Sequence, residues 1–185
     1  MNVEMILATD RQGGLGKEGR LPWPHLKEDM RRFQVITEAA ICVMGRVTYN
    51  DIKAAALERG RTVEDIAEHG ILKGRTSIVL SSTLEEVEGA SVKKTLRDVF
   101  NEYVETDERI VVIGGEKLFI QAMAWVNIVH HTVIDNVYTC DRFFPVETLA
   151  TGAFAIEGDK ITSEELECNV YFTTYSRRSP VVITL

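Results

Sequence analysis

Five short apolar runs divide the chain and predict five strands. They occupy residues 3–9, 41–44, 76–80, 109–113 and 128–134, and glycine or serine follows several of them. Runs this short, with apolar residues at successive positions, are typical of strands that are covered on both faces. We therefore expect these strands to form the interior of a sheet.

Helical periodicity describes the segments between these strands. Residues 27–38 place Met30, Phe33 and Ile36 on roughly one helical face, and residues 47–57, 95–104 and 115–124 also favour helix. Strands that alternate with helices imply a mostly parallel sheet. Residues 167–176 alternate like one more strand, with 154–157 as a candidate partner. Because these last segments have no helical connection, we expect an antiparallel C-terminal edge.

The predicted fold class is therefore α/β, with a mostly parallel central sheet flanked by helices. The length of 185 residues suits one domain over residues 1–185, because domains usually contain roughly 100–200 residues. Residues 53–71 are charged and contain glycine, with a helix-like piece at 63–68, so we predict a surface insertion there.

Composition narrows the class of protein. The net charge of −7 disfavours nucleic acid, and no cluster of basic residues offsets it. Three widely spaced cysteines predict neither a disulfide framework nor a zinc motif, and the histidines lack metal-ligand spacing, so no metal site is expected. No signal peptide or membrane helix is apparent. We expect a soluble, cytoplasmic protein, with a monomer as the predicted state.

Asp29 is the first candidate for chemistry. In a helix that starts near Leu26, it faces the same way as Phe33, four residues later. A carboxyl on that face would be partly desolvated, and its raised pKa would suit proton handling or pairing with a heterocycle. The ordinary alternative is an acidic residue that stabilises the first helical turn, as Glu28 does. Spacing alone favours this alternative.

Three strand ends carry signals for anion binding. Gly45, Arg46 and Thr48 follow one strand, Gly114 and Gly115 follow another, and small hydroxyl residues follow residue 80. Ligands of open α/β sheets bind beyond the carboxyl ends of strands, where helix N-termini offer free amides. Arg46 and Lys94 are candidates to bind an extra 2′-phosphate, which would favour NADPH over NADH. No G-x-G-x-x-G fingerprint occurs, and each turn taken alone is typical of plain strand-end geometry.

Taken in order, these motifs resemble dihydrofolate reductase over nearly the whole chain. The matching stretches are residues 13–24 with Leu21-Pro22-Trp23-Pro24, residues 43–49 with Gly45-Arg46-Val47-Thr48, residues 72–82, residues 112–115 with Gly114-Gly115, residues 132–135 and residues 141–145. Each stretch is modestly specific, whereas their order and separation are highly specific. The resemblance implies NADPH-dependent reduction of 7,8-dihydrofolate to tetrahydrofolate, which supports one-carbon metabolism and thymidylate synthesis.

The resemblance also implies catalytic roles. Asp29 would bind the ring nitrogen and 2-amino group of the pterin and favour protonation of nitrogen 5, while carbon 6 receives the hydride. Thr132 would support that carboxylate, and Trp23 would hold an ordered water. Leu21 sits where a mobile loop closes over nicotinamide. On this interpretation Asp29 has a role in the chemistry.

The resemblance implies a substrate pocket for dihydrofolate or antifolate inhibitors. Arg75 matches the arginine that pairs with the α-carboxylate of the substrate, and its alternative is a solvated surface arginine. Seven further residues would contact the substrate: Ile6, Leu7, Asp29, Phe33, Ile52, Leu72 and Ile113. For the apolar members of this set, and for Leu7 above all, the alternative is ordinary core.

The implied cofactor is NADPH, held along the strand ends. Its predicted contacts are Ala8, Gly16, Leu21, Gly45, Arg46, Val47, Thr48, Leu80, Ser81, Ser82, Lys94, Ile113, Gly114, Gly115, Glu116, Lys117, Leu118 and Phe119. Gly114 and Gly115 match a pair that a cis peptide joins in the family.

Three positions depart from the family pattern. Val47 replaces a residue that is often polar, while Phe119 and His130 stand where tyrosine is common. Two alternatives remain: a related reductase of a pyrimidine or flavin precursor, and a non-catalytic binding protein on the same fold. Asp29 together with Arg75 argues against the first, and the set of Asp29, Thr132, Gly114 and Gly115 argues against the second.

Overall fold

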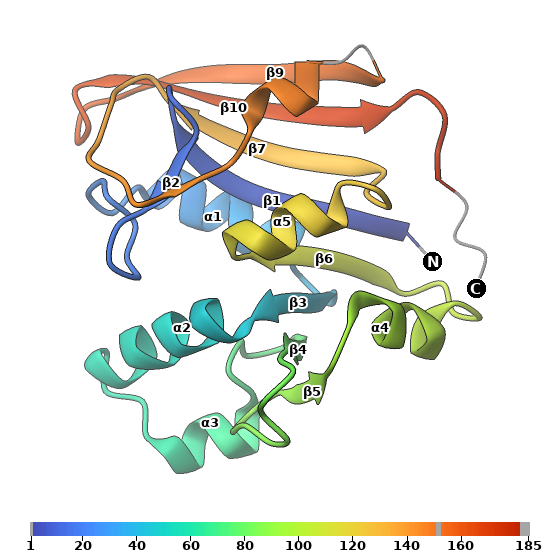
Figure 1. Ribbon diagram of the computed structural model, residues 1–185. Coiled ribbons are helices and arrows are strands. Elements are labelled where there is room, and N and C mark those ends of the chain that lie inside the picture. Colours follow the sequence, from blue (N-terminus) through green and yellow to red (C-terminus); the bar gives the residue numbers. More distant parts are fainter. Residues whose placement is uncertain (1, 151–152, 182–185) are drawn as a thin grey trace.

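The computed structural model describes residues 2–150 and 153–181, so the ends of the predicted domain at residues 1 and 182–185 lie outside it. An eight-stranded sheet runs through the molecule in the order β5-β4-β3-β6-β1-β7-β10-β9 (Figure 1). Its strands are β1 (Asn2–Asp10), β3 (Ile41–Gly45), β4 (Thr76–Leu80), β5 (Ser91–Lys93), β6 (Arg109–Gly114), β7 (Ile128–Ile134), β9 (Phe154–Ser163) and β10 (Cys168–Arg177).

The direction of the strands follows the sequence pattern. Strands β1, β3, β4, β5, β6 and β7 pair in parallel, whereas β10 pairs antiparallel with both β7 and β9. The predicted α/β class and its antiparallel C-terminal edge are confirmed. Strand β9 is longer than the expected 154–157. A second small sheet pairs β2 (Gly14–Gly16) with β8 (Arg142–Phe143), which the sequence pattern does not predict.

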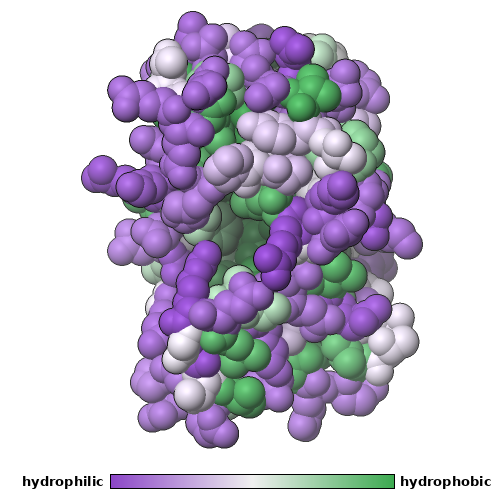
Figure 2. All heavy atoms as spheres, turned by 90° about the vertical axis from the view of Figure 1, so that its left-hand side faces the viewer, coloured by the Kyte–Doolittle hydropathy of each residue, from purple (hydrophilic) through white to green (hydrophobic). Residues whose placement is uncertain are grey.

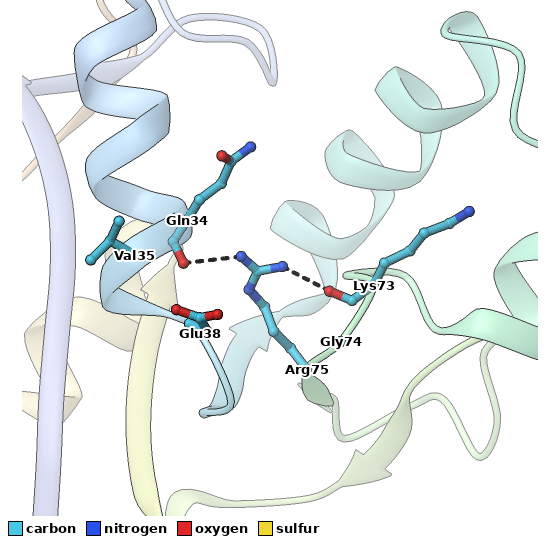
Figure 3. A pocket seen from close by; sticks show the side chains of 6 residues that line it. All are labelled: Gln34, Val35, Glu38, Lys73, Gly74 and Arg75. Atoms are coloured by element: carbon cyan, nitrogen blue, oxygen red, sulfur yellow. Dashed lines mark hydrogen bonds between the residues drawn. The ribbon is translucent and has the colours of Figure 1, made fainter.

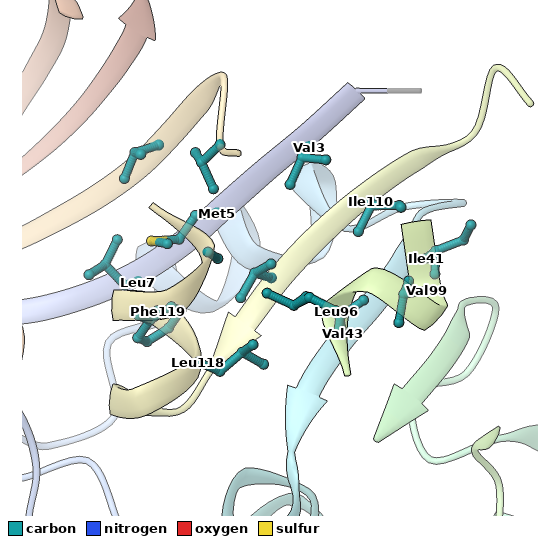
Figure 4. Packing of buried hydrophobic residues seen from close by; sticks show 14 of the residues in the cluster. Val3, Met5, Leu7, Ile41, Val43, Leu96, Val99, Ile110, Leu118 and Phe119 are labelled. Atoms are coloured by element: carbon teal, nitrogen blue, oxygen red, sulfur yellow. The ribbon is translucent and has the colours of Figure 1, made fainter. Parts of the chain in front are cut away.

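Helices cover both faces of the large sheet. The helices are α1 (Lys27–Ile36), α2 (Arg46–Glu58), α3 (Val63–His69), α4 (Leu96–Tyr103) and α5 (Glu116–Ala122), and a 3-10 turn spans Val146–Ala150. Side chains of α4 and α5 join the principal core with Val3, Met5 and Leu7 of β1 (Figure 4). Helices α1 and α2 pack on the other face, through Phe33 and Tyr49. Among residues 2–150 and 153–181, none of the helices combines the length and the apolar character that a membrane span requires.

Capping explains where several helices begin. The Thr95 hydroxyl accepts a hydrogen bond from the Asp98 amide, and the Asp98 side chain accepts one from the Thr95 amide, so α4 starts with a capping box. Thr62 caps α3 in a similar way. Helix α1 has no side-chain cap, although Asp29 lies in its first turn. The Asp29 side chain is therefore available to partners outside the helix.

The segment 53–71 contains the end of α2 and the whole of α3. Its residues Ala56, Ile66 and Ile71 are buried, and they pack with Tyr49 and Val79. Burying each aliphatic side chain the size of isoleucine contributes roughly 1.5–3 kcal/mol. The segment expected as a surface insertion thus supplies part of the core beside α2.

Candidate active site

The carboxyl ends of the parallel strands meet on one side of the molecule, where α2 and the loop around β2 also lie. Figure 2 views this side and shows a hollow with an apolar floor between polar flanks. Ligands of open α/β sheets bind at such an edge. Most of the residues predicted to form the site lie on the elements that end here.

Asp29 is half-buried in the first turn of α1, and Thr132 of β7 is fully buried. Burial raises the pKa of Asp29 above its ordinary value, because a carboxylate loses solvation when it leaves water. A hydrogen bond from Thr132 and the positive charge of Arg32 act in the opposite direction. The structure therefore brings the predicted acid and its predicted partner together in a setting suited to proton exchange.

Apolar side chains form two patches that meet at Ile113, and one of them includes Phe33, one helical turn after Asp29. Phe33 and Ile6 belong to one cluster, and Ile52 and Leu72 belong to another. Ile113 packs against both clusters, so the two patches form a continuous surface. These five residues are all among those predicted to contact substrate. Their arrangement offers a wall that fits a flat, largely apolar ring system.

Leu7 does not join this wall. Successive side chains of a strand point to opposite faces of the sheet, so Leu7 points away from Ile6. Its side chain is 5% exposed and packs in the principal core with Phe119. The structure thus separates the Leu7 side chain from the other predicted substrate contacts, and the core alternative describes it.

The loop before α1 places Trp23 and Leu21 differently. Trp23 is 6% exposed and packs edge-on against Tyr138, with 5.8 Å between ring centroids. It shares a small cluster with Ala8, which lies on the same face of β1 as Ile6. Leu21, by contrast, is 53% exposed. Trp23 is fixed against the sheet, whereas Leu21 is available to cover a ligand.

Two aspartates that the sequence analysis missed hold this loop. Asp10 Oδ1 accepts hydrogen bonds from the amides of Gln12 and Gly14 at 2.8 Å, and its Oδ2 accepts one from the Tyr138 amide at 2.9 Å. The Asp141 carboxylate accepts from the Glu18 amide at 3.1 Å. Asp10 could have been suspected, since it follows a buried strand and precedes glycines. Asp141 opens the stretch 141–145 that resembles the family, but nothing in that stretch indicates a contact with the Glu18 amide.

Arg75 lies at one end of the site, in a pocket of about 340 Å³ lined by Gln34, Val35, Glu38, Lys73, Gly74 and Arg75 (Figure 3). Its guanidinium donates to the carbonyl oxygens of Gln34 at 3.2 Å and Lys73 at 2.8 Å. These contacts fix the planar group between α1 and the turn before β4. A guanidinium held in this way can meet a carboxylate with two parallel hydrogen bonds.

Gly45, Thr48, Gly114 and Gly115 meet where β3 and β6 end. A cis peptide joins Gly114 to Gly115, as the resemblance implies. A β-carbon on Gly114 would lie 2.9 Å from the Thr48 hydroxyl, and one on Gly115 would lie 3.1 Å from it. Helix α2 starts after Gly45 without a side-chain cap, so its first amides remain available to an anion. The close fit of glycine backbone to hydroxyl forms a cradle that suits a phosphate group.

The remaining predicted cofactor contacts differ in exposure. Arg46 and Val47 are exposed, whereas Leu118 and Phe119 are buried, and Phe119 packs edge-on against Phe144. The Ser81 hydroxyl accepts from the amides of Thr83 and Leu84, so it caps its own turn. Lys94 forms an ion pair with Glu85 at 2.8 Å. Ser82 is exposed beside Ser81. The other predicted contacts lie on β1, β2, β4, β6 and α5, and they are Ala8, Gly16, Leu80, Ile113, Glu116 and Lys117.

Comparison with known proteins connects this geometry to a family. The chain is 32% identical to dihydrofolate reductase of Haemophilus influenzae over 145 residues, which cover 78% of this chain and 79% of that protein. It is 28% identical over 149 residues to the bifunctional dihydrofolate reductase-thymidylate synthase of Paramecium tetraurelia, a match that covers 80% of this chain and 29% of that longer protein.

A solved structure and a family model agree with these relatives. Dihydrofolate reductase from Enterococcus faecalis, complexed with NADP(H) and RAB-propyl, superimposes with a TM-score of 0.76 and 25% identity, covering 96% of this chain and 97% of that one. The family model described as dihydrofolate reductase matches residues 2–63 and 60–177. The matched regions contain every strand and helix that forms the site, and the chain belongs to the dihydrofolate reductase family.

Proposed function

We propose that the chain reduces 7,8-dihydrofolate to 5,6,7,8-tetrahydrofolate with NADPH, and so serves one-carbon metabolism and thymidylate synthesis. The observation that carries the proposal is the half-buried Asp29, hydrogen-bonded to Thr132 beside the apolar wall of Phe33, Ile6 and Ile113. A pterin has an amidine-like edge for the carboxylate and a flat ring for the wall. Membership of the family and the NADP(H)-bound relative support the same reaction.

The residues of the chain divide the work of binding and proton handling. Asp29 accepts hydrogen bonds from the pterin ring nitrogen and 2-amino group, which orients the ring and favours the protonated state of nitrogen 5. Thr132 holds the carboxylate in place, and Trp23 positions a water near the ring. Leu21 closes over the reacting rings and excludes bulk water. Bound NADPH supplies the hydride that carbon 6 receives.

The two ends of the site bind the two charged groups. Arg75 pairs with the α-carboxylate of the substrate, because its guanidinium already has a fixed orientation in the pocket of Figure 3. The cradle formed by Gly45, Thr48, Gly114 and Gly115 receives phosphate of the cofactor. Arg46 provides the exposed cation for the 2′-phosphate. Antifolates compete for the same apolar wall.

All of these groups come from one chain, so a monomer suffices for activity. Cys42, Cys140 and Cys168 are unpaired, which favours a reducing compartment such as the cytoplasm. Sedimentation of the purified protein tests the monomer, and a mass corresponding to a dimer at micromolar concentration would exclude it.

NADPH oxidation in the presence of dihydrofolate tests the reaction. We expect turnover by the parent protein and a loss on the order of 100-fold in Asp29→Asn, because the neutral amide cannot support the protonated ring. Glu28→Gln, an exposed neighbour on the same helix, is the matched control and retains parental activity. Absence of turnover in the parent overturns the proposed reaction, while undiminished turnover in Asp29→Asn removes Asp29 from it.

A further inference from the structure

The guanidinium of Arg32 lies near Asp29, the residue proposed to bind the pterin, and it contacts two strands, β7 and β10. Its Nη1 donates to the His131 carbonyl oxygen at 3.2 Å and to the Thr132 hydroxyl oxygen at 3.3 Å. Its Nη2 donates to the Thr173 carbonyl oxygen at 3.1 Å and to the Thr174 hydroxyl oxygen at 3.3 Å. Arg32 follows Asp29 by three residues, so both side chains leave neighbouring positions on α1.

An aromatic ring completes the surroundings of this cation. The guanidinium carbon lies 5.3 Å from the centroid of the Phe172 ring, within the range of a cation–π contact. Arginine suits this place because its planar fork serves two strands at once, which the single ammonium of lysine cannot do. The cation is therefore fixed on both sides, by β7 and by β10.

Thr132 connects Arg32 to Asp29. A hydroxyl group has one hydrogen to donate and two lone pairs to accept. Since Arg32 donates to the Thr132 oxygen, the hydroxyl hydrogen remains for another acceptor, and Thr132 is hydrogen-bonded to Asp29. Thr132 is fully buried, so water does not compete for that hydrogen. The contact from Arg32 thus orients the hydroxyl as a donor toward the carboxylate.

We propose that Arg32 is a positioning residue for the reaction, which acts by directing the Thr132 hydroxyl onto Asp29 and by placing a fixed positive charge behind that carboxylate. The inference rests on the proposed dihydrofolate reduction only for its kinetic consequence, because the hydrogen-bond arrangement exists without substrate. Arg32 touches neither pterin nor cofactor in this scheme. It sets the orientation and the proton affinity of the group that does.

The charges around the pair support this assignment. Burial raises the pKa of Asp29, and Thr132 and Arg32 both counter that rise. The pKa of Arg32 is lowered by burial, while Asp29 and Asp159 of β9 stabilise its charge. His131 of β7 is held neutral by burial, and the charge of Arg32 adds to that effect. In this cluster Asp29 and Asp159 are the anions that stabilise the charge of Arg32. Arg32 is the cation that lowers the pKa of both Asp29 and His131.

The test compares Arg32→Met and Arg32→Lys with Arg31→Met, an exposed arginine on the same helix. The pKa of Asp29 is measured by carbon-13 NMR of its carboxyl group, assigned through Asp29→Asn, and the pH profile of kcat/KM is measured in parallel. We expect Arg32→Met to raise both values by about one unit, because an opposing charge and an oriented donor are lost. Arg32→Lys raises them less, and Arg31→Met leaves them at the parental values.

A second arm asks whether Arg32 acts through Thr132. In a double-mutant cycle, Arg32→Met should shift the Asp29 pKa less when Thr132→Val is already present. Equal shifts in both backgrounds would overturn the role of the hydroxyl. An unchanged Asp29 pKa in folded Arg32→Met would overturn the proposal entirely. If Arg32→Met does not fold, an unchanged Asp29 pKa in Arg32→Lys overturns the proposal instead.

The two arms separate this proposal from the proposed reaction. NMR titration reports on Asp29 whether or not the parent protein turns over dihydrofolate. An upward shift of the Asp29 pKa without any turnover would retain the positioning role and remove the reaction. Parental turnover with an unmoved pKa would retain the reaction and remove the positioning role.

Discussion

The Nε of Arg75 donates a hydrogen bond to the Thr37 hydroxyl at 2.8 Å, although 38 residues separate them in the chain. The same hydroxyl donates to the Phe33 carbonyl oxygen at 2.7 Å. Thr37 is thus oriented by the last turn of α1 and holds the guanidinium through Nε. The second hydrogens of Nη1 and Nη2 remain for a carboxylate. The end of one helix therefore controls the group proposed to bind the substrate carboxylate.

Thr37→Val tests this control. The isosteric change removes the acceptor for Arg75, so we expect KM for dihydrofolate to rise about threefold to tenfold with little change in kcat. Arg75→Ala should raise KM roughly 10- to 100-fold, because the charge-assisted pair itself is lost. A dihydropterin that lacks the glutamate serves as the control substrate. If Thr37→Val weakened both substrates equally, the effect would not pass through Arg75.

Arg46 should distinguish the two nicotinamide cofactors. It is the first residue of α2, and its side chain is exposed. We expect Arg46→Ala to weaken the binding of NADPH about tenfold and to change the binding of NADH hardly at all, because only NADPH carries the 2′-phosphate. Dissociation constants from fluorescence titration measure both, with Arg59→Ala at the other end of α2 as control. Equal weakening of the two cofactors would remove Arg46 from the 2′-phosphate site.

Asp10 should contribute strongly to stability. Its carboxylate accepts three hydrogen bonds from backbone amides. The residue as a whole is only 1% exposed. In Asp10→Asn the side-chain NH2 group, which is a donor, would face one of these backbone N–H donors. Because that N–H would lose its acceptor, the free energy of unfolding should fall by about 2 kcal/mol. Urea denaturation measures the change. Asp107→Asn, at an exposed site, is the matched control, and equal stability of the two variants would contradict the assigned role.

His131 should make stability depend on pH. Burial lowers the pKa of His131 to about 4, and its Nε2 lies 2.9 Å from the Thr9 hydroxyl. The unfolded chain binds a proton near pH 6.5 and the folded chain does not, so stability falls as pH decreases from about 6.5 toward 4. Between pH 7 and pH 5 the loss should be about 2 kcal/mol.

Urea denaturation at both pH values measures this loss. His131→Gln cannot take up a proton, so its stability should change less over the same range. A parental slope in His131→Gln would assign the pH dependence to other groups.

The sequence predicts most of the sheet and much of the site, because both depend on local patterns. Apolar runs mark the parallel strands, and Gly114 and Gly115 mark the turn beside Thr48. Leu7 shows the limit of such patterns. Every residue from Val3 to Leu7 is buried, whichever face of the sheet its side chain occupies, so hydrophobicity alone does not tell the two faces apart.

Arg32 and the small sheet escape sequence analysis for a different reason. The contacts of Arg32 with β10 cross 141 residues, and its charge predicts a solvated helix face. Strands β2 and β8 contain three and two residues, too few for a periodic signal. Residues 53–71 resemble a surface segment because their charges outnumber Ala56, Ile66 and Ile71, whose burial depends on packing against α2 and β4. Long-range contacts of single side chains leave no repeat in the sequence.

The dependence of Arg32 on β10 has a consequence for the chain as it is made. Helix α1 leaves the ribosome early, whereas Thr173 and Thr174 follow only after every other element of the site. Until then the guanidinium lacks half of its hydrogen-bond acceptors, and β7 lacks its antiparallel neighbour. A nascent chain that stops before β10 thus carries all of the predicted contact residues in an unfinished arrangement. Competence for ligand binding should therefore arise late in translation, once β10 has paired with β7.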